Sequence, residues 1–118
     1  MANDLRYPST KLVEDRCFCE RCFYWIKSYK AIDKCIFTYW FNSNSIVHTS
    51  DGEMFFTENY KGFSMNKKYF NNLDVEYDIE YSVCMLFCSY IKSLCCQYSF
   101  KQVEAKVEKD ERLRPIRH

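Results

Sequence analysis

Eight cysteines in a chain of 118 residues restrict its fold more than any other feature of the sequence. Cysteines at this density form disulfides in an oxidising compartment, and act as metal ligands or buried thiols in a reducing one. Met1 to Lys11 is charged, contains Pro8 and has no apolar stretch long enough for a secretory signal. We therefore expect a cytoplasmic or nuclear protein whose thiols are not paired with one another.

The length fits one domain, and 47% apolar and 19% aromatic residues supply enough apolar surface for a packed core. Only two prolines occur, Pro8 and Pro115, and they bracket the part that we expect to fold. The sequence predicts a flexible N-terminal segment over 1–11, a single globular domain over 12–100 and a charged C-terminal helix or tail over 101–118.

Apolar residues recur at spacings of three and four in two stretches, which predicts helices over about 22–41 and about 75–98. The first set is Trp25, Tyr29, Ile32, Ile36 and Trp40, and the second is Ile79, Val83, Leu86, Tyr90 and Leu94. Within the second stretch, the window 81–100 has Lys92 as its only charge. Serines and a glutamine interrupt that window, so we expect a buried core helix and no membrane span.

Between these helices, β-branched and aromatic residues flank the dipeptide Asp51-Gly52, which is typical of a tight hairpin turn. We expect the stretch 60–69 to supply a third strand, which an isolated hairpin needs for stability. The sequence thus predicts an α+β fold, with a small antiparallel β-hairpin or three-stranded sheet over about 46–70 between the two main helices and a C-terminal helical tail.

Three thiols, Cys17, Cys19 and Cys22, precede the first predicted helix among charged residues, where a helix N-terminus favours thiolates. Zinc takes four ligands, so the sequence predicts a zinc site that adds Cys35 to these three. Alternative ligands are His48 and three cysteines that share one face of the later helix, Cys84, Cys88 and Cys95. Burial as small apolar side chains is the simpler interpretation of the cysteines in that helix.

The segment from Cys17 to Trp25 resembles a zinc-binding stretch of the polyomavirus small t antigens. In both, a Cys-aromatic-Cys-x-x-Cys-aromatic run leads into a helix with a tryptophan. The resemblance is confined to this segment, and it implies zinc at this motif.

The sequence contains few residues or motifs that could support catalysis. Cys19 and Cys22 have the Cys-x-x-Cys spacing of thiol–disulfide redox proteins, but no βαβ pattern surrounds them, so a redox function is kept as an alternative. Two glycines and two histidines provide neither a phosphate-binding loop nor an acid–base pair. We expect that the protein is not an enzyme.

Ten Tyr, ten Phe and two Trp predict aromatic surface that binds another protein or a second copy in a homodimer. The sequence therefore favours a cysteine-rich intracellular interaction module. Its abundance of Asn, Tyr, Phe, Lys and Ile indicates an AT-rich genome, for instance that of a large DNA virus or a parasite, and so favours a viral or parasite accessory protein. The alternative is binding of single-stranded nucleic acid through Lys67, Lys68, Tyr69, Arg112 and Arg114. A formal net charge of +1 does not favour it.

Overall fold

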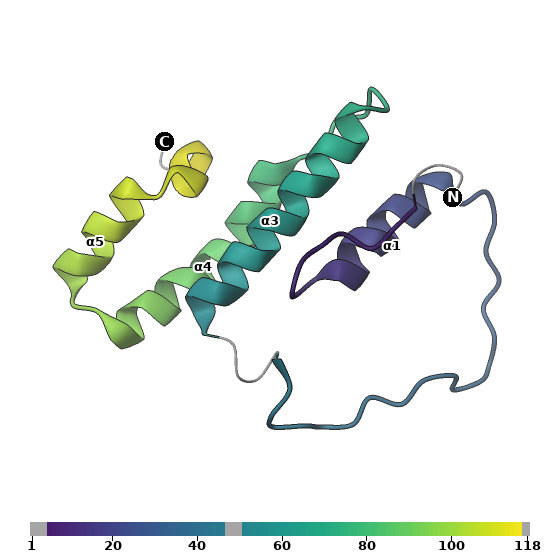
Figure 1. Cartoon of the computed structure of the whole chain (residues 1–118), viewed down its shortest axis with the longest axis horizontal. Coiled ribbons are helices and arrows are strands. Elements are labelled where there is room, and N and C mark those ends of the chain that lie inside the picture. The colour runs from purple at the N-terminus through teal and green to yellow at the C-terminus, as the bar shows by residue number, and fades with distance from the viewer. Residues whose placement is uncertain (1–4, 47–50, 117–118) are drawn as a thin grey trace.

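The computed structural model describes residues 5–46 and 51–116. Within these ranges the chain forms α1 (Glu14–Trp25), α3 (Gly52–Asn71), α4 (Ile79–Gln97), α5 (Phe100–Lys109) and a final 3-10 helix, η2 (Glu111–Ile116) (Figure 1). Neither range contains a β-strand. The predicted α+β fold is therefore wrong, and the architecture is helical.

The long helix α3 occupies most of the stretch predicted as a hairpin and sheet over about 46–70. Residues 47–50, which belong to the first predicted strand and its turn, lie outside the described residues. A carboxylate oxygen of Asp51 accepts a hydrogen bond from the backbone N–H of Met54 at 2.7 Å, so this residue is the N-cap of α3. The buried residues of α3 follow at spacings of three and four, and include Phe56, Asn59, Phe63, Asn66 and Phe70. The third strand expected at 60–69 lies wholly within this helix.

The helix predicted over 22–41 is also wrong for most of its length. α1 ends at Trp25, and residues 26–45 contain neither helix nor strand. β-branched and aromatic residues crowd this stretch and favour a helix poorly. An amphipathic helix also needs a surface that buries its apolar face, whereas Tyr29, Ile36 and Trp40 are exposed.

α4 covers most of the second predicted helix. Its N-cap is Asp78, whose carboxylate accepts a hydrogen bond from the backbone N–H of Tyr81 at 2.9 Å. Val83, Tyr90 and Leu94 of α4 are buried. Among the described helices, α4 is long and apolar enough to cross a membrane by length and composition, with a mean hydropathy of 1.3.

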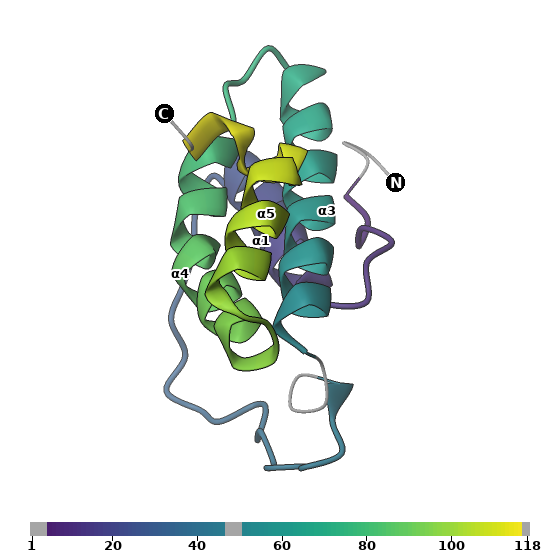
Figure 2. The same cartoon turned by 90° about the vertical axis from the view of Figure 1, so that its left-hand side faces the viewer.

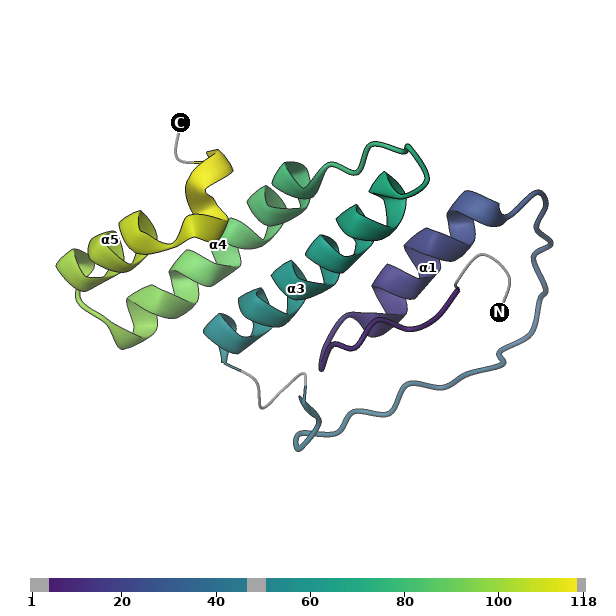
Figure 3. The same ribbon diagram turned by 45° about the horizontal axis from the view of Figure 1, so that its top comes forward.

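The larger core lies between α3 and α4, which run antiparallel (Figure 3). The ring of Phe56 stacks on that of Tyr90 with their centroids 4.3 Å apart. α5 and η2 close this core with Val103 and Leu113, and the guanidinium of Arg112 lies 4.8 Å from the centre of the Phe56 ring. The C-terminal elements thus pack onto the α3–α4 pair.

α1 packs against α3 on the side away from α5, as Figures 1 and 2 show together. The contacts between α1 and α3 advance in the same direction along both helices, and pair Cys17 with Gly62, Arg21 with Asn66 and Trp25 with Tyr69. The two helices are therefore parallel. Their connection has to return along the 20 residues of α3, which is about 30 Å at the rise of an α-helix.

Residues 26–46, which we call the crossover segment, belong to this return path and swing wide of the helices (Figure 1). The radius of gyration is 17.0 Å, whereas a compact domain of this length measures about 13–14 Å. The segment was predicted as a packed helix, and the parallel arrangement of α1 and α3 makes it a connector instead.

Candidate interaction surface

Large apolar side chains gather in the crossover segment and stay exposed there. We call Ile36–Phe41 the aromatic run, and its apolar and aromatic members are each between 74% and 82% exposed: Ile36, Phe37, Tyr39, Trp40 and Phe41. Single exposed apolar residues are ordinary on protein surfaces, whereas a contiguous set of this size marks a binding surface.

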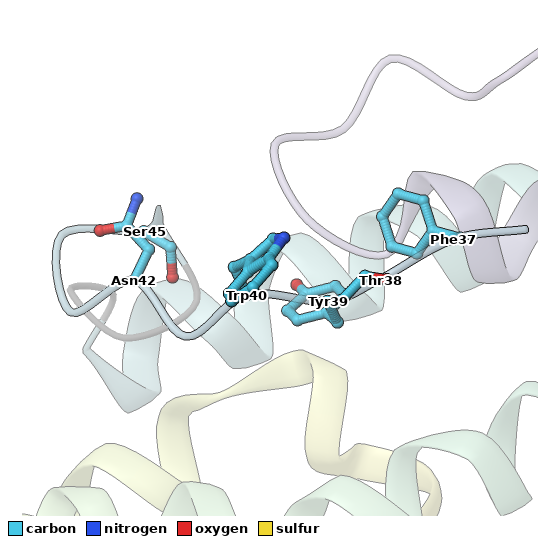
Figure 4. A pocket seen from close by; sticks show the side chains of 6 residues that line it. All are labelled: Phe37, Thr38, Tyr39, Trp40, Asn42 and Ser45. Atoms are coloured by element: carbon cyan, nitrogen blue, oxygen red, sulfur yellow. The ribbon is translucent and has the colours of Figure 1, made fainter. Parts of the chain in front are cut away.

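The aromatic run forms a shallow hollow of about 260 Å³ with the turn that follows it. The lining residues all belong to the crossover segment, and are Phe37, Thr38, Tyr39, Trp40, Asn42 and Ser45 (Figure 4). The rings of Phe37 and Tyr39 lie 6.1 Å apart, as expected for residues two apart on one side of an extended chain. The backbone N–H of Ser45 donates to the carbonyl of Asn42 at 3.0 Å and closes the turn.

Cys17 is fully buried where α1 meets α3. Burial raises the pKa of its thiol from 9.0 to about 11, and the carboxylate of Glu20 adds to the shift. A thiol in such a place is a packing residue at neutral pH, because the thiolate is the form that binds metals and attacks disulfides.

The other predicted zinc ligands are not beside Cys17. Cys19 and Cys22 share a face of α1, about 140–200° around the helix from Cys17 at 100° per residue. Cys35 is exposed in the crossover segment, where its thiol donates to the carbonyl of Phe37 at 3.2 Å. Across residues 5–46 and 51–116, no group of three His, Cys, Asp or Glu side chains is placed to hold a metal.

The alternative ligands do not complete the cluster either. Cys84, Cys88 and Cys95 lie exposed on α4, and α3 stands between α4 and α1 (Figures 1 and 3). His48 lies outside the described residues. The structure therefore brings none of these three cysteines to the thiols of α1.

A buried polar network joins α1 to α3 and to the turn before α4, and the sequence analysis missed it. Arg21 donates through Nε to Oδ1 of Asn66 at 2.7 Å. The amide nitrogen of Asn66 donates to Oε2 of Glu20 at 2.8 Å and to the carbonyl of Cys17 at 3.1 Å. The hydroxyl of Tyr77 donates to the same Glu20 oxygen at 2.7 Å. One amide thus serves a cation and an anion together.

Burial and the Glu20 carboxylate raise the pKa of Tyr77 above its usual range, so its hydroxyl stays a donor at every ordinary pH. The sequence contains one signal for this network. Asn59 and Asn66 stand seven residues apart within the apolar stripe of α3, and polar residues on a buried helix face imply buried hydrogen-bond partners.

The residues predicted to contact nucleic acid form two separate groups. Lys67 and Lys68 are exposed near the end of α3, and the Tyr69 hydroxyl accepts a hydrogen bond from Trp25 Nε1 at 2.8 Å. Arg112 binds Asp110 and the hydroxyl of Thr57. Thr57 precedes Lys67 by ten residues, or about 15 Å along α3.

Arg114, the remaining predicted contact, is exposed on η2 and pairs with Glu111 at 3.9 Å. Arg112 and Arg114 of η2 thus each pair with a carboxylate two or three residues before them in the sequence.

Comparison of the chain with models of protein families, with curated proteins and with solved structures finds no match.

Proposed function

We propose that the chain is a non-enzymatic protein-interaction module that binds its partner through the aromatic run. The observation that carries this proposal is the exposure of five large apolar side chains, each at least 74%, in six consecutive residues. Burying one such side chain contributes about 1.5–3 kcal/mol. A partner that covered the run would gain most of that energy, because the helices of this chain cover none of these residues well.

The mode of binding follows from the backbone of the run. It contains neither helix nor strand, runs as an open trace (Figure 4), has no proline or glycine, and consists of β-branched and aromatic residues. Such a segment adds as a strand to the exposed edge of a sheet, where main-chain hydrogen bonds supply affinity and alternate side chains fill pockets. Ile36, Thr38 and Trp40 would then face one side of the partner sheet, and Phe37, Tyr39 and Phe41 the other.

Photocrosslinking in the source cells tests the contact. A photoreactive phenylalanine analogue replaces Tyr39 or, as a matched control, Tyr81, which is 64% exposed on α4. We expect one crosslinked protein from position 39 and none from position 81. Purified partner then has to bind the free chain, and Trp40→Ala has to weaken that binding. An affinity unchanged by Trp40→Ala overturns the proposal.

Proline substitutions test the strand-addition mode. Adjacent amides of an extended chain point to opposite sides, so Thr38→Pro and Tyr39→Pro together remove one donor from each side. Only one side of an added strand bonds to the partner sheet, so one of the two variants should weaken binding about tenfold. That variant loses a main-chain hydrogen bond to a sheet edge from which water is excluded. Ser43→Pro, in the turn after the run, is the control. If neither variant loses affinity while Trp40→Ala does, the interaction stands and strand addition is wrong.

The other predictions from the sequence have tests of their own. The zinc site stays a prediction, and metal content of the reduced protein with Cys17, Cys19 and Cys22 each changed to Ser decides it. The thiol redox alternative requires a mixed disulfide at Cys19 or Cys22. Nucleic-acid binding requires an affinity that falls steeply between about 50 and 200 mM salt.

A further inference from the structure

A second surface lies away from the crossover segment, where the last turns of α1 meet the end of α3. Three residues of α1, the last buried phenylalanine of α3 and three residues of the α3–α4 turn line an open hollow of about 340 Å³. We call it the aromatic–acidic hollow, and it is lined by Glu20, Phe23, Tyr24, Phe70, Val75, Glu76 and Tyr77.

The aromatic rings of the hollow are held at fixed angles. Phe70 stacks on Tyr77 with centroids 5.4 Å apart and an angle of 9° between the rings. Tyr24 meets Phe70 nearly at right angles, 76°, at 5.8 Å. Phe23 is 72% exposed at the rim. Aromatic residues attract a cation through the faces of their rings. The exposed side chains of Phe23 and Tyr24 leave ring surface open at this hollow.

Charge points to the same class of ligand. The lining contains two carboxylates, Glu20 and Glu76, and no lysine, arginine or histidine. Oε2 of Glu20 accepts a hydrogen bond from the Tyr77 hydroxyl, and Oε1 pairs with Arg16 at 3.3 Å. These contacts hold the Glu20 carboxylate in place, and Arg16 offsets part of its negative charge. Glu76 is exposed and has no ion pair with the residues that the structure describes. Its negative charge is available to a bound cation.

We propose that the aromatic–acidic hollow binds a trimethylammonium group. An unmodified ammonium is strongly hydrated, and a hollow with mainly aromatic walls replaces its water poorly. A methylated ammonium has a weakly hydrated surface that contacts ring faces well, and it keeps the positive charge that Glu76 complements. The group has two sources, a free choline-like molecule or a trimethylated lysine of another protein. This site is independent of the aromatic run.

The test compares choline with its neutral isostere, in which a tert-butyl group replaces the trimethylammonium group. Binding is followed by NMR shifts of the Tyr24, Phe70 and Tyr77 ring protons in the full chain. We expect choline to bind about tenfold more tightly than the isostere. That ratio corresponds to a cation–aromatic attraction between the values for a fully exposed and a fully desolvated site. Equal affinities, or no shift with either probe, overturn the proposal.

Variants assign the effect to the hollow. Tyr24→Leu and Phe23→Leu should each abolish the preference for choline, and Glu76→Gln should reduce it about threefold. Phe100→Leu and Glu80→Gln are matched controls, because both residues are exposed and neither lines the hollow. A preference that survives Tyr24→Leu in a folded protein contradicts the site. Phe23 is mostly exposed, so Phe23→Leu should leave folding intact. It therefore still tests the site if Tyr24→Leu fails to fold.

A peptide with trimethyllysine and the same peptide with unmodified lysine distinguish the two sources. Tighter binding of the trimethylated peptide than of choline assigns the site to a modified protein, and tighter binding of choline assigns it to a free molecule. Tighter binding of the unmodified peptide than of the trimethylated one overturns the proposal.

Discussion

Gly62 of α3 lies so close to Cys17 of α1 that a Cβ added to it would stand 2.9 Å from the cysteine sulfur. Gly52, at the start of α3, meets the side chain of Ser93 in α4 in the same way. Neither glycine has a positive φ, so close approach of two helices, and not backbone conformation, explains both. The two glycines of the chain thus mark where α3 contacts its two helical neighbours.

Gly62→Ala should lower the free energy of unfolding by about 1 kcal/mol. Overpacking costs about 1–3 kcal/mol, which exceeds the gain of about 1 kcal/mol that alanine brings to a helix interior. In a Cys17→Ala background the sulfur is absent, and the same substitution should stabilise the protein. Urea unfolding of the four proteins measures the coupling. Stabilisation by Gly62→Ala in both backgrounds would show that α1 and α3 are not in contact there.

Cys17 should resist alkylation at neutral pH while Cys19 and Cys35 react quickly. Its side chain is fully buried, and the pKa of about 11 leaves almost no thiolate at pH 7. The rate of iodoacetamide labelling at each cysteine, followed by mass spectrometry, checks this, and 6 M urea, at about the concentration that unfolds small domains, should remove the difference. Equal native rates at Cys17 and Cys19 would contradict the burial.

Stability should fall at alkaline pH, and Cys17 should account for part of the fall. Its folded-state pKa of about 11 exceeds the ordinary value of 9.0, so the folded state holds the proton more tightly. The stabilisation is complete below pH 9 and is lost as the pH rises to 11. It amounts to at most about 2–3 kcal/mol.

Cys17→Ala should therefore flatten the dependence of unfolding free energy on pH over this interval. The pKa of Tyr90 is raised to about 12 by burial and by Asp110, so the decline above pH 10 should remain in both proteins. Urea unfolding at a series of pH values compares them. A slope that Cys17→Ala leaves unchanged would assign the alkaline loss to the tyrosines alone.

The sequence was sufficient to predict α4 but not the crossover segment, although both contain an apolar stripe of helical period. In α4 the stripe, the cap at Asp78 and the burial of Tyr90 agree. The stripe from Tyr29 to Trp40 has no surface to cover it, because α1 and α3 pack in parallel and this stretch has to connect their opposite ends. Relative helix direction is a tertiary property that no local window contains.

The misassigned hairpin has a different cause. Asp51-Gly52 suits a hairpin turn and an N-cap equally well, since aspartate favours both. The distinguishing signal was the stripe from Phe56 to Phe70, whose three-and-four spacing continues beyond the length of an ordinary strand. In the site, the excess of aromatic residues predicted exposed rings, whereas the pairing of Arg21 with Asn66 depends on helix register and was not predictable.

Asp51→Ala should lower the free energy of unfolding by about 1 kcal/mol, because it removes the acceptor for the Met54 N–H at the start of α3. Asp51→Asn should be nearly neutral, since asparagine caps helices as well as aspartate does. Thermal unfolding followed by circular dichroism measures both variants. If alanine and asparagine were equally tolerated, this end of α3 would not depend on the cap.

Asn66→Ala should be the most destabilising of these substitutions, at about 2–4 kcal/mol, because it removes the amide that hydrogen-bonds both the buried Arg21 and the half-buried Glu20. Asn71→Ala is the matched control, since Asn71 is exposed on the same helix and should change stability by less than about 0.5 kcal/mol. Urea unfolding at neutral pH gives both values, and equal effects would contradict the network.

Asn66→Asp separates the hydrogen bonds of Asn66 from its packing, because the side chain keeps its size. The new carboxylate still accepts a hydrogen bond from Arg21. It cannot donate one to Glu20, whose Oε2 lies 2.8 Å from the amide nitrogen in the native protein.

The loss of this donor should make the stability of the variant depend on pH. Contact between a carboxylate at position 66 and that of Glu20 raises the pKa of the pair. A raised folded-state pKa means that stability increases as the pH falls. The variant should therefore be strongly destabilised at pH 7 and regain stability towards about pH 5, where one shared proton restores a donor between the two residues. A deficit that stayed constant with pH would mean that Asn66 acts through packing alone.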